Sequence, residues 1–511
     1  MESSQRKIGV ILSYIAILVN TLVGFFYVPI LLKYMGQNEY GLYQLMGSLI
    51  AYFSIMDFGL SSTVIRYYSK YQETTDTKSA ENVLGISRRI YNVLTLLVLI
   101  FGGIFYLNIE NIFQGSLNTY EMNESKKIFI VLIFNIVITL ITNIYTSVIT
   151  ANEKFIFIKL LSILQTSVQP FVVIALLSIS PKAFTMTLIL TSFNFLVGII
   201  KVIYTKYILK TRIIYHYPDK LLLRSMLGFS LSVFTVSMVD QIFWRSNQII
   251  LGIVSGTSVV AIYSIAAQIY MNFMPLSTVI QGVFLPRITK LVSKKISDKE
   301  LSDLFIRIGR IQFILLSCVL TGFVLYGEEF IVIWVGEKFT EAYWITLIIL
   351  FPFMIDLIQN IGLTIMQAKD QYSFRAKIYL LMAILNIFLS VILSNLYGTI
   401  GAAFSLGTTM LIGNGIIMNI YYYFKVGIDI PLFWKNIIKM IPVLLIPMLL
   451  GFTLKYFIGI KGFISLFLTL FLYVVIYFFF MWILGMNRYE KNMLLEPMKK
   501  IYKKLKLLKT Y

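Results

Sequence analysis

Four charged side chains lie within long apolar stretches of the chain and could carry out binding chemistry there: Asp57, Asp240, Arg245 and Asp356. A charge at the centre of a membrane helix costs about 2.5 to 3.5 kcal/mol on insertion scales, so such charges usually face an interior or a water-filled cavity. An Arg guanidinium binds phosphate oxygens through two parallel hydrogen bonds. Arg245 is therefore a candidate for binding phosphate, and the three acids are candidates for binding a coupling proton or Na+.

Uncharged polar side chains recur at helical spacing in the same stretches, and they form the set predicted to line a cavity: Gln241, Gln248, Asn360, Gln268 and Asn272. The alternative is that these side chains hold neighbouring helices together by hydrogen bonds, which is common within membranes. Both interpretations remain open for each of them.

Two further charges, and Asp57 among the first four, have two interpretations each. Arg66 and Arg287 lie at matching ends of apolar stretches and would form a basic inner entrance to the cavity, or would anchor the helix ends at the membrane surface. Asp57 would bind a coupling ion, or would anchor a tight helix packing beside Gly59. The sequence does not decide between these roles.

The composition requires that a membrane surrounds these residues. Of 511 residues, 58% are hydrophobic and only 13% are charged, about half the share found in ordinary soluble domains. Apolar runs bounded by charge clusters predict about 14 transmembrane helices, near 8–32, 41–65, 90–109, 128–150, 157–179, 184–205, 226–254, 258–285, 310–335, 342–368, 378–396, 400–424, 437–458 and 462–484. The predicted fold class is an all-α polytopic membrane protein.

The distribution of basic residues predicts the orientation of these helices. The net charge is +20, and with the N-terminus placed in the cytoplasm 36 of the 44 Lys and Arg residues fall in inner segments. Lys and Arg collect in cytoplasmic loops of membrane proteins, so both termini are predicted to be cytoplasmic and nucleic acid is not expected as a partner. With one His, one Cys and short outer loops, we expect no catalytic site, no metal site and no cofactor.

An internal repeat relates the two halves of the chain. Residues 36–43 and 256–263 both read Gly, four residues, a small residue, an aliphatic residue and Tyr, at an offset of 220. A second similarity joins residues 151–155 to residues 368–372. The repeat predicts two six-helix bundles at 1–224 and 225–425, two additional helices at 426–484 and a basic amphipathic cytoplasmic tail at 485–511, with a substrate path at the interface of the bundles.

Several short motifs make a family resemblance specific. They are Gly41-Leu42-Tyr43, Asp57-Phe58-Gly59-Leu60 followed by Arg66, Ile250-Leu251-Gly252, and Gly398-Thr399-Ile400-Gly401-Ala402-Ala403. Together they resemble the polysaccharide transporter family of the multidrug, oligosaccharidyl-lipid and polysaccharide flippase superfamily. Relatives often carry an acid–base pair where this chain has Asn247 and Gln248, so their coupling chemistry is not transferred.

The resemblance implies a flippase that carries a polyprenyl-diphosphate-linked oligosaccharide from the inner to the outer leaflet of a bacterial cytoplasmic membrane, in O-antigen or capsule assembly. A proton or Na+ gradient is the candidate driving force, and a polysaccharide polymerase and assembly proteins are candidate partners besides the lipid-linked substrate and membrane lipids. The alternative is a cation-coupled multidrug or organic-cation antiporter of the same superfamily. The intramembrane charges, three acids and one base, do not exclude this alternative.

Overall fold

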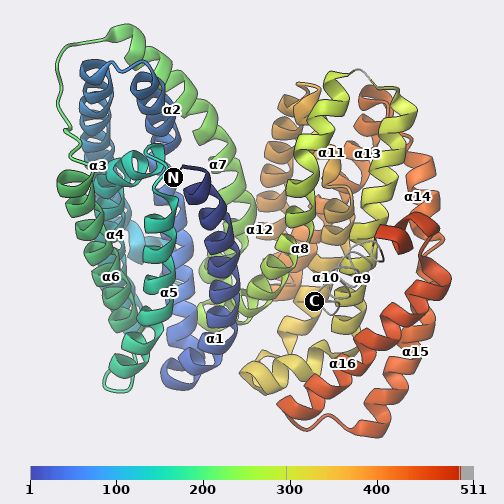
Figure 1. Cartoon of the computed structure of the whole chain (residues 1–511). Coiled ribbons are helices and arrows are strands. Elements are labelled where there is room, and N and C mark those ends of the chain that lie inside the picture. Colours follow the sequence, from blue (N-terminus) through green and yellow to red (C-terminus); the bar gives the residue numbers. More distant parts are fainter. Residues whose placement is uncertain (1, 295, 494, 496–511) are drawn as a thin grey trace, which may run out of the picture. The chain divides into compact units, whose positions relative to one another are not determined.

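The computed structural model describes residues 2–294, 296–493 and 495, and these residues are helical with no β-strand (Figure 1). They form two compact units, which are described separately. The first unit contains residues up to 264 together with 383–402. Its complete elements are α1 (Glu2–Ser54), the 3₁₀ turn η1 (Ile55–Asp57), α2 (Leu60–Glu73), α3 (Thr77–Phe113), α4 (Thr119–Ala151), α5 (Phe155–Leu177), α6 (Ala183–Ile203), the π-helical turn η2 (Tyr204–Ile208) and α7 (Lys220–Ser255).

Packing within the first unit joins helices that are distant in the sequence. Helix α4 packs against α3 and α6, and α1 packs against α5 and α7.

Polar residues define the beginnings of several helices. Asn118 and Glu121 form a reciprocal capping box at the start of α4. Asp76 caps α3, and the hydrogen bonds that it accepts from Ser79 hold the pKa of its carboxyl below its usual range.

The second unit contains residues 265–382 and those from 403 onward. Two helices, α8 (Thr257–Ser293) and α12 (Tyr372–Met410), contribute residues to both units. The other elements are α9 (Asp298–Val335), η3 (Glu337–Phe339), α10 (Glu341–Ile358), α11 (Ile361–Ala368), η4 (Leu411–Ile417), α13 (Met418–Tyr421), η5 (Tyr422–Val426), α14 (Ile430–Ile438), α15 (Ile441–Ile458), α16 (Phe463–Phe480) and η6 (Met481–Gly485).

Helices α9 and α10 form the core of the second unit. In the most apolar stretches of these two helices 72% and 67% of the residues are buried, whereas 22% are buried in the corresponding stretches that contain α15 and α16. Helix α9 packs against α10, α14, α15 and α16. Large apolar side chains such as Phe457 and Ile464 remain more than 80% exposed on the outer two helices. A surface of this kind is stable in lipid, where apolar side chains carry no hydration penalty.

The number of membrane crossings agrees with the prediction. Twelve helical stretches of the described residues are long and apolar enough to cross a membrane. Two of them, Ile15–Glu73 and Tyr372–Val426, are 59 and 55 residues long, more than twice the roughly 20 residues that one crossing needs. The backbone leaves the helical conformation at Gly36 and Gly398 within these stretches. Counting each as two crossings gives about 14 transmembrane helices.

The predicted repeat is visible in the backbone. Gly36 has φ 75° and ψ 176°, and Gly256, 220 residues later, has φ 83° and ψ −172°. This conformation is readily adopted only by glycine. The two repeat segments also meet within the first unit, because the side-chain amide of Gln37 donates a 3.0 Å hydrogen bond to the carbonyl of Ser258. The glycines of the motif therefore mark equivalent helix breaks in the two halves.

The second predicted similarity corresponds to the same helix-ending turn. Glu153 and Asp370 both adopt left-handed conformations, with φ 55° and 57°. The amides of Asn152, Glu153 and Lys154 bond to the carbonyls four, three and five residues earlier, and those of residues 369, 370 and 371 repeat this pattern. This arrangement satisfies the terminal carbonyls of a helix. The predicted domain limits at 224, 425 and 484 remain predictions, and most of the predicted amphipathic tail (494 and 496–511) lies outside the described residues.

Candidate functional site

Arg245 lies half-buried on α7 and keeps most of its hydrogen-bonding capacity. Among the described residues its guanidinium donates one hydrogen bond, at 3.4 Å from Nη1 to Oε1 of Gln248. It also interacts electrostatically with the phenol groups of Tyr43 and Tyr52 on α1. A guanidinium has five N–H donors, so this side chain has donors left for an anionic ligand. Its surroundings are aromatic and polar, with hydroxyl groups that are hydrogen-bond donors as well.

Gln248, which accepts the hydrogen bond from Arg245, is only 3% exposed. Its Oε1 accepts a hydrogen bond from the hydroxyl of Ser48 on α1, and its Nε2 donates one of 3.2 Å to the hydroxyl of Ser264 on α8. The predicted contact of Gln248 with substrate stays a prediction. In the structure it links α7 to α1 and α8 and accepts one further hydrogen bond from the guanidinium of Arg245.

Asn247 forms a second buried junction at the neighbouring position. Its amide donates hydrogen bonds of 3.0 Å to the hydroxyl of Tyr263 and 2.9 Å to the carbonyl of Ala402, and it accepts one of 3.1 Å from Asn386. Asn247 and Gln248 occupy the two positions at which members of the family that the sequence resembles often carry an acid–base pair. They connect helices by neutral hydrogen bonds, which need no counterion in the membrane.

Asp57 is the centre of a hydrogen-bonded network in the first unit. Its Oδ1 accepts bonds from the hydroxyl groups of Ser61 and Tyr91, both 3.1 Å long, and from Nδ2 of Asn143 at 2.8 Å. The amide of Ser61 donates to Oδ2 at 3.3 Å. The donors come from α2, α3 and α4. Because these groups satisfy a carboxylate, they favour the structural interpretation of Asp57 over ion coupling.

The second half of the chain contains a matching network with a neutral centre. Ser277, at the repeat offset of 220 from Asp57, donates a 2.8 Å hydrogen bond to the carbonyl of Leu357. Asn360, at an offset of 217 from Asn143, donates to its hydroxyl at 3.4 Å. The side-chain amide of Gln312 lies 3.0 Å from the same hydroxyl. Asn360 was predicted to line a cavity, and it is only 8% exposed within this network.

Asp356 lies beside an arginine that the sequence placed in a loop. Arg375, near the start of α12, is 8% exposed, and its Nη2 lies 3.7 Å from Oδ1 of Asp356. Its Nη1 also donates a hydrogen bond to Oδ1 of Asn414, and its guanidinium lies 5.0 Å from the centre of the Tyr379 ring. Asp356 is therefore part of a charge pair within the second unit.

The other predicted residues are more exposed. Asp240 and Asn272 are exposed, Gln241 and Gln268 are half-buried, and Asn272 bonds to the carbonyl of Gln268 one turn earlier on α8 at 2.7 Å. Arg66 is exposed with its guanidinium 4.7 Å from the centre of the Phe229 ring, and Arg287 is exposed.

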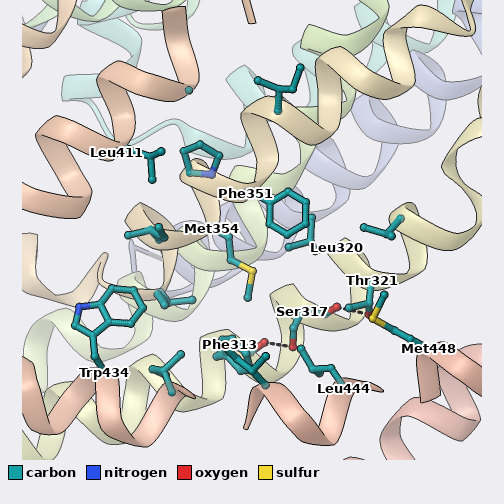
Figure 2. A pocket seen from close by; sticks show the side chains of 18 of the residues that line it. Phe313, Ser317, Leu320, Thr321, Phe351, Met354, Leu411, Trp434, Leu444 and Met448 are labelled. Atoms are coloured by element: carbon teal, nitrogen blue, oxygen red, sulfur yellow. Dashed lines mark hydrogen bonds between the residues drawn. The ribbon is translucent and has the colours of Figure 1, made fainter. Parts of the chain in front are cut away.

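The second unit contains an apolar cavity of about 700 Å³ that the sequence did not reveal (Figure 2), and it opens to the surface of the unit, where the lining residues Phe351 and Leu445 are 54% and 58% exposed. Its lining comes from α9, α10, α12, α14 and α15, and includes Leu320, Phe351, Met354 and Leu444. No charged side chain lines it.

Two of the three hydroxyl groups at the cavity wall are already bonded within the protein, and the third, that of Thr408, is exposed. Ser317 shares a 2.6 Å hydrogen bond with Tyr477, and Thr321 accepts one of 2.6 Å from Tyr473. Both tyrosines belong to α16. The cavity therefore presents an apolar surface to any ligand.

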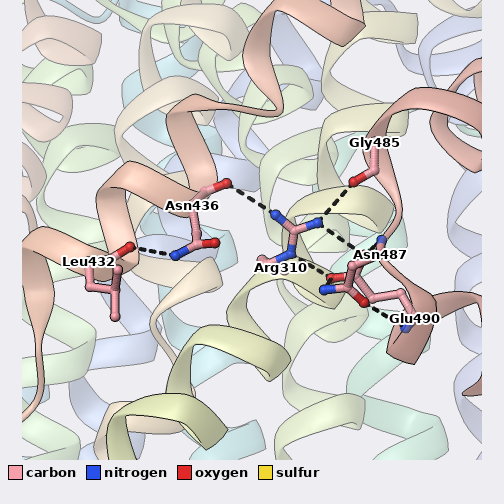
Figure 3. A network of polar contacts seen from close by, with 6 residues as sticks. All are labelled: Arg310, Leu432, Asn436, Gly485, Asn487 and Glu490. Atoms are coloured by element: carbon pink, nitrogen blue, oxygen red, sulfur yellow. Dashed lines mark hydrogen bonds and ion pairs between the residues drawn. The ribbon is translucent and has the colours of Figure 1, made fainter.

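A buried ion pair joins the additional C-terminal helices to α9 (Figure 3). Nε of Arg310 lies 2.6 Å from Oε1 of Glu490, and Nη2 lies 3.1 Å from Oε2 of the same carboxylate. The guanidinium also donates to the carbonyls of Asn436 and Gly485, at 3.2 and 2.9 Å. These bonds support the end of α14 and the turn after α16, and with them the outer wall of the apolar cavity.

Comparison with solved structures shows which fold this is. A structure described as the lipid II flippase MurJ in an inward closed conformation is 17% identical, with 92% of this chain and 98% of that chain covered and a TM-score of 0.69. An inward-facing multidrug resistance MATE family transporter of the MOP superfamily is 11% identical over 76% of this chain and 92% of that one, with a TM-score of 0.60. A MOP superfamily transporter from Pyrococcus furiosus is 11% identical over 80% and 92%, with a TM-score of 0.53.

At these identities the likeness shows the fold alone, the fold that these membrane proteins share. No curated protein matches the sequence significantly. The profile of the family described as "Polysaccharide biosynthesis protein" matches residues 7–292, more than half of the chain. The protein belongs to this polysaccharide biosynthesis family.

Proposed function

We propose that the protein is a flippase that moves a polyprenyl-diphosphate-linked oligosaccharide from the inner to the outer leaflet, for the assembly of a cell-surface polysaccharide such as O-antigen or capsule. The observation that carries the proposal is the apolar cavity of about 700 Å³. Ligand sites typically have volumes of about 300 to 1,000 Å³. A cavity without a charged lining residue suits an isoprenoid chain and offers no counterion to an organic cation.

Arg245 is the proposed ligand of the diphosphate. Its free donors and the nearby hydroxyls of Tyr43 and Tyr52 would hydrogen-bond to phosphate oxygens, and Gln248 would orient it. Arg66 and Arg287 are proposed to attract the substrate on the inner side. Asp240 and Asp356 are the proposed sites for a coupling proton or Na+, and transport would follow alternating access of the two repeat bundles.

The test uses purified protein in liposomes. We expect a labelled polyprenyl-diphosphate oligosaccharide to reach the opposite leaflet faster than in empty liposomes, and a cationic dye not to accumulate. Flipping is measured with and without a proton or Na+ gradient. Uptake of the dye without flipping would replace this proposal by the antiporter alternative.

Two matched pairs of variants examine the proposed roles. Arg245→Ala should abolish flipping, whereas Arg224→Ala, an exposed arginine on the same helix, should not. Leu445→Trp, which fills the cavity from an exposed position, should slow flipping, whereas Leu449→Trp on the same helix lies outside the cavity lining and should not. Equal flipping rates for the two variants of a pair would show that the residue tested in that pair takes no part in the mechanism.

The proposed location is the cytoplasmic membrane of a bacterium, with both termini in the cytoplasm and a polysaccharide polymerase and assembly proteins as partners. Cys318 is buried, so introduced cysteines can report the topology without interference. Thr74→Cys should react with an impermeant thiol reagent from the cytoplasmic side, and Gly115→Cys from the outer side. The opposite labelling would reverse the proposed orientation and the direction of transport.

A further inference from the structure

The linker between the two halves of the chain is fixed to α3 by specific contacts. Oδ1 of Asn82 accepts hydrogen bonds from the amides of His216 and Tyr217, at 2.9 and 3.2 Å, and His216 Nε2 lies 2.7 Å from Glu81. At Gly85 the linker approaches so closely that a Cβ atom would lie 2.4 Å from the carbonyl oxygen of Ile214. The linker therefore has a defined position at the start of α3.

This docking creates a pocket of about 360 Å³ between α3, the linker and the start of α7. One wall is apolar and consists of Ile86, Ile90, Val93, Leu223 and Leu227. Val93 and Leu227 are 58% and 41% exposed, so the apolar wall continues onto the surface of the unit. The apolar runs of α3 and α7 predicted to cross the membrane, 90–109 and 226–254, begin beside this pocket, so we expect it at the boundary between water and lipid.

Two cations line the same pocket and have unused hydrogen-bond donors. The guanidinium of Arg89 lies 3.3 Å from the centre of the Tyr215 ring, and this stacking is its only contact of a polar or aromatic kind among the described residues. Lys220 likewise has no hydrogen bond or ion pair within the described part of the chain. A guanidinium that lies over a ring face still directs its N–H groups outward in its own plane, where they can reach an anion.

The position of Lys220 is unfavourable without a ligand. It is the first residue of α7, and a positive charge at a helix N-terminus opposes the helix dipole. Asp219 also lines the pocket, and its carboxylate accepts a 2.9 Å hydrogen bond from the amide of Leu222. The pocket thus contains two positive charges and one negative charge.

We propose that this pocket binds an anionic phospholipid, with its phosphate between Arg89 and Lys220 and the first part of an acyl chain on the apolar wall. The net charge of +1 complements the single charge of a phosphodiester such as that of phosphatidylglycerol. A polyprenyl diphosphate carries more negative charge than this pocket can neutralise. The bound lipid would brace the linker that joins the two halves of the transporter.

Binding is measured by native mass spectrometry of the full-length protein released from detergent with phosphatidylglycerol or phosphatidylcholine. We expect phosphatidylglycerol to be retained about tenfold more strongly, and Arg89→Ala and Lys220→Ala each to reduce its binding about tenfold. The matched controls Arg88→Ala and Arg224→Ala remove exposed cations that do not line the pocket, and should bind as the unchanged protein does.

Thermal unfolding without lipid separates binding from folding. Lys220→Ala should unfold at the same temperature as the unchanged protein or slightly higher, because it removes a charge that opposes the helix dipole. Addition of phosphatidylglycerol should then raise the unfolding temperature of the control variants and not that of Lys220→Ala. Equal lipid effects in Lys220→Ala and Arg224→Ala would overturn the proposal, as would displacement of phosphatidylglycerol by a lower concentration of a polyprenyl diphosphate.

Discussion

Arg375 pairs with Asp356 at 3.7 Å within the second unit and bonds to Asn414 with the same guanidinium. The pair joins α12 to α10, and its arginine comes directly before an apolar run. A guanidinium that is 8% exposed cannot be solvated by bulk water. The charge of Asp356 is therefore matched within the protein, so a proton or Na+ that binds there must compete with Arg375.

Removing one charge of the Asp356–Arg375 pair should destabilise the protein more than removing both charges. We expect Asp356→Asn and Arg375→Gln each to lower the free energy of unfolding by about 3 kcal/mol, because the remaining charge has lost its partner. The double variant Asp356→Asn, Arg375→Gln should recover much of this loss. Denaturant unfolding in detergent measures all three, and purely additive losses in the double variant would show that the two charges do not interact.

The network around Asp57 predicts a graded effect of substitution. Asp57→Ala should cost about 2 to 4 kcal/mol, since it leaves without an acceptor the amide of Asn143 and one of the hydroxyls of Ser61 and Tyr91, which can bond only to each other at 3.1 Å. Asp57→Asn retains one acceptor oxygen and should cost less. Unfolding temperatures are measured beside flipping rates. If Asp57→Asn folds as well as the unchanged protein but loses its dependence on an ion gradient, Asp57 couples ions instead of supporting the structure.

The close approach of the repeat segments makes Gly41 sensitive to the smallest substitution. A Cβ atom there would lie less than 2 Å from the carbonyl oxygen of Thr257, whereas at Gly47 on the same helix nothing lies within 4 Å. We expect Gly41→Ala to destabilise the protein strongly. Gly47→Ala should be neutral or stabilising by up to about 1 kcal/mol, because alanine favours the helix. Comparable stabilities of the two variants would contradict the observed packing.

The sequence predicted the spans and the repeat because both depend on local patterns. Apolar runs of suitable length defined the helices, and Gly36 and Gly256 were found because a left-handed backbone position restricts the residue type. The partners of the buried charges could not be found in this way. Arg375 and Arg310 were assigned to the inner segments, because a basic residue at the edge of an apolar run looks the same whether it snorkels or turns inward.

The apolar cavity was also beyond prediction from the sequence. Its walls come from five helices, and the first and last lining residues, Phe313 and Met448, are more than a hundred residues apart in the sequence. Each helix contributes ordinary apolar side chains such as Leu320 and Met354. The hydrogen-bonded network of Ser277 was hidden for a similar reason. Its equivalence with Asp57 becomes visible only when Asn143 and Asn360 are seen to make the same contact.

The Arg310–Glu490 pair gives a test of how the additional helices support the cavity. Arg310→Lys keeps the charge but has three N–H donors on one nitrogen and cannot reproduce the four bonds that the planar guanidinium makes to Glu490, Asn436 and Gly485, so we expect a loss of about 1.5 to 3 kcal/mol in the free energy of unfolding. Arg307→Lys, on the same helix, is the control: its guanidinium lies 4.9 Å from the centre of the Tyr489 ring. Unfolding in detergent is measured together with the fluorescence of Trp434 at the cavity wall, in a protein whose other four tryptophans are replaced by Phe. If α14 and α15 are held by Arg310, its lysine variant should shift the Trp434 signal toward that of a solvated indole, whereas an unchanged signal would show that apolar packing alone holds the wall.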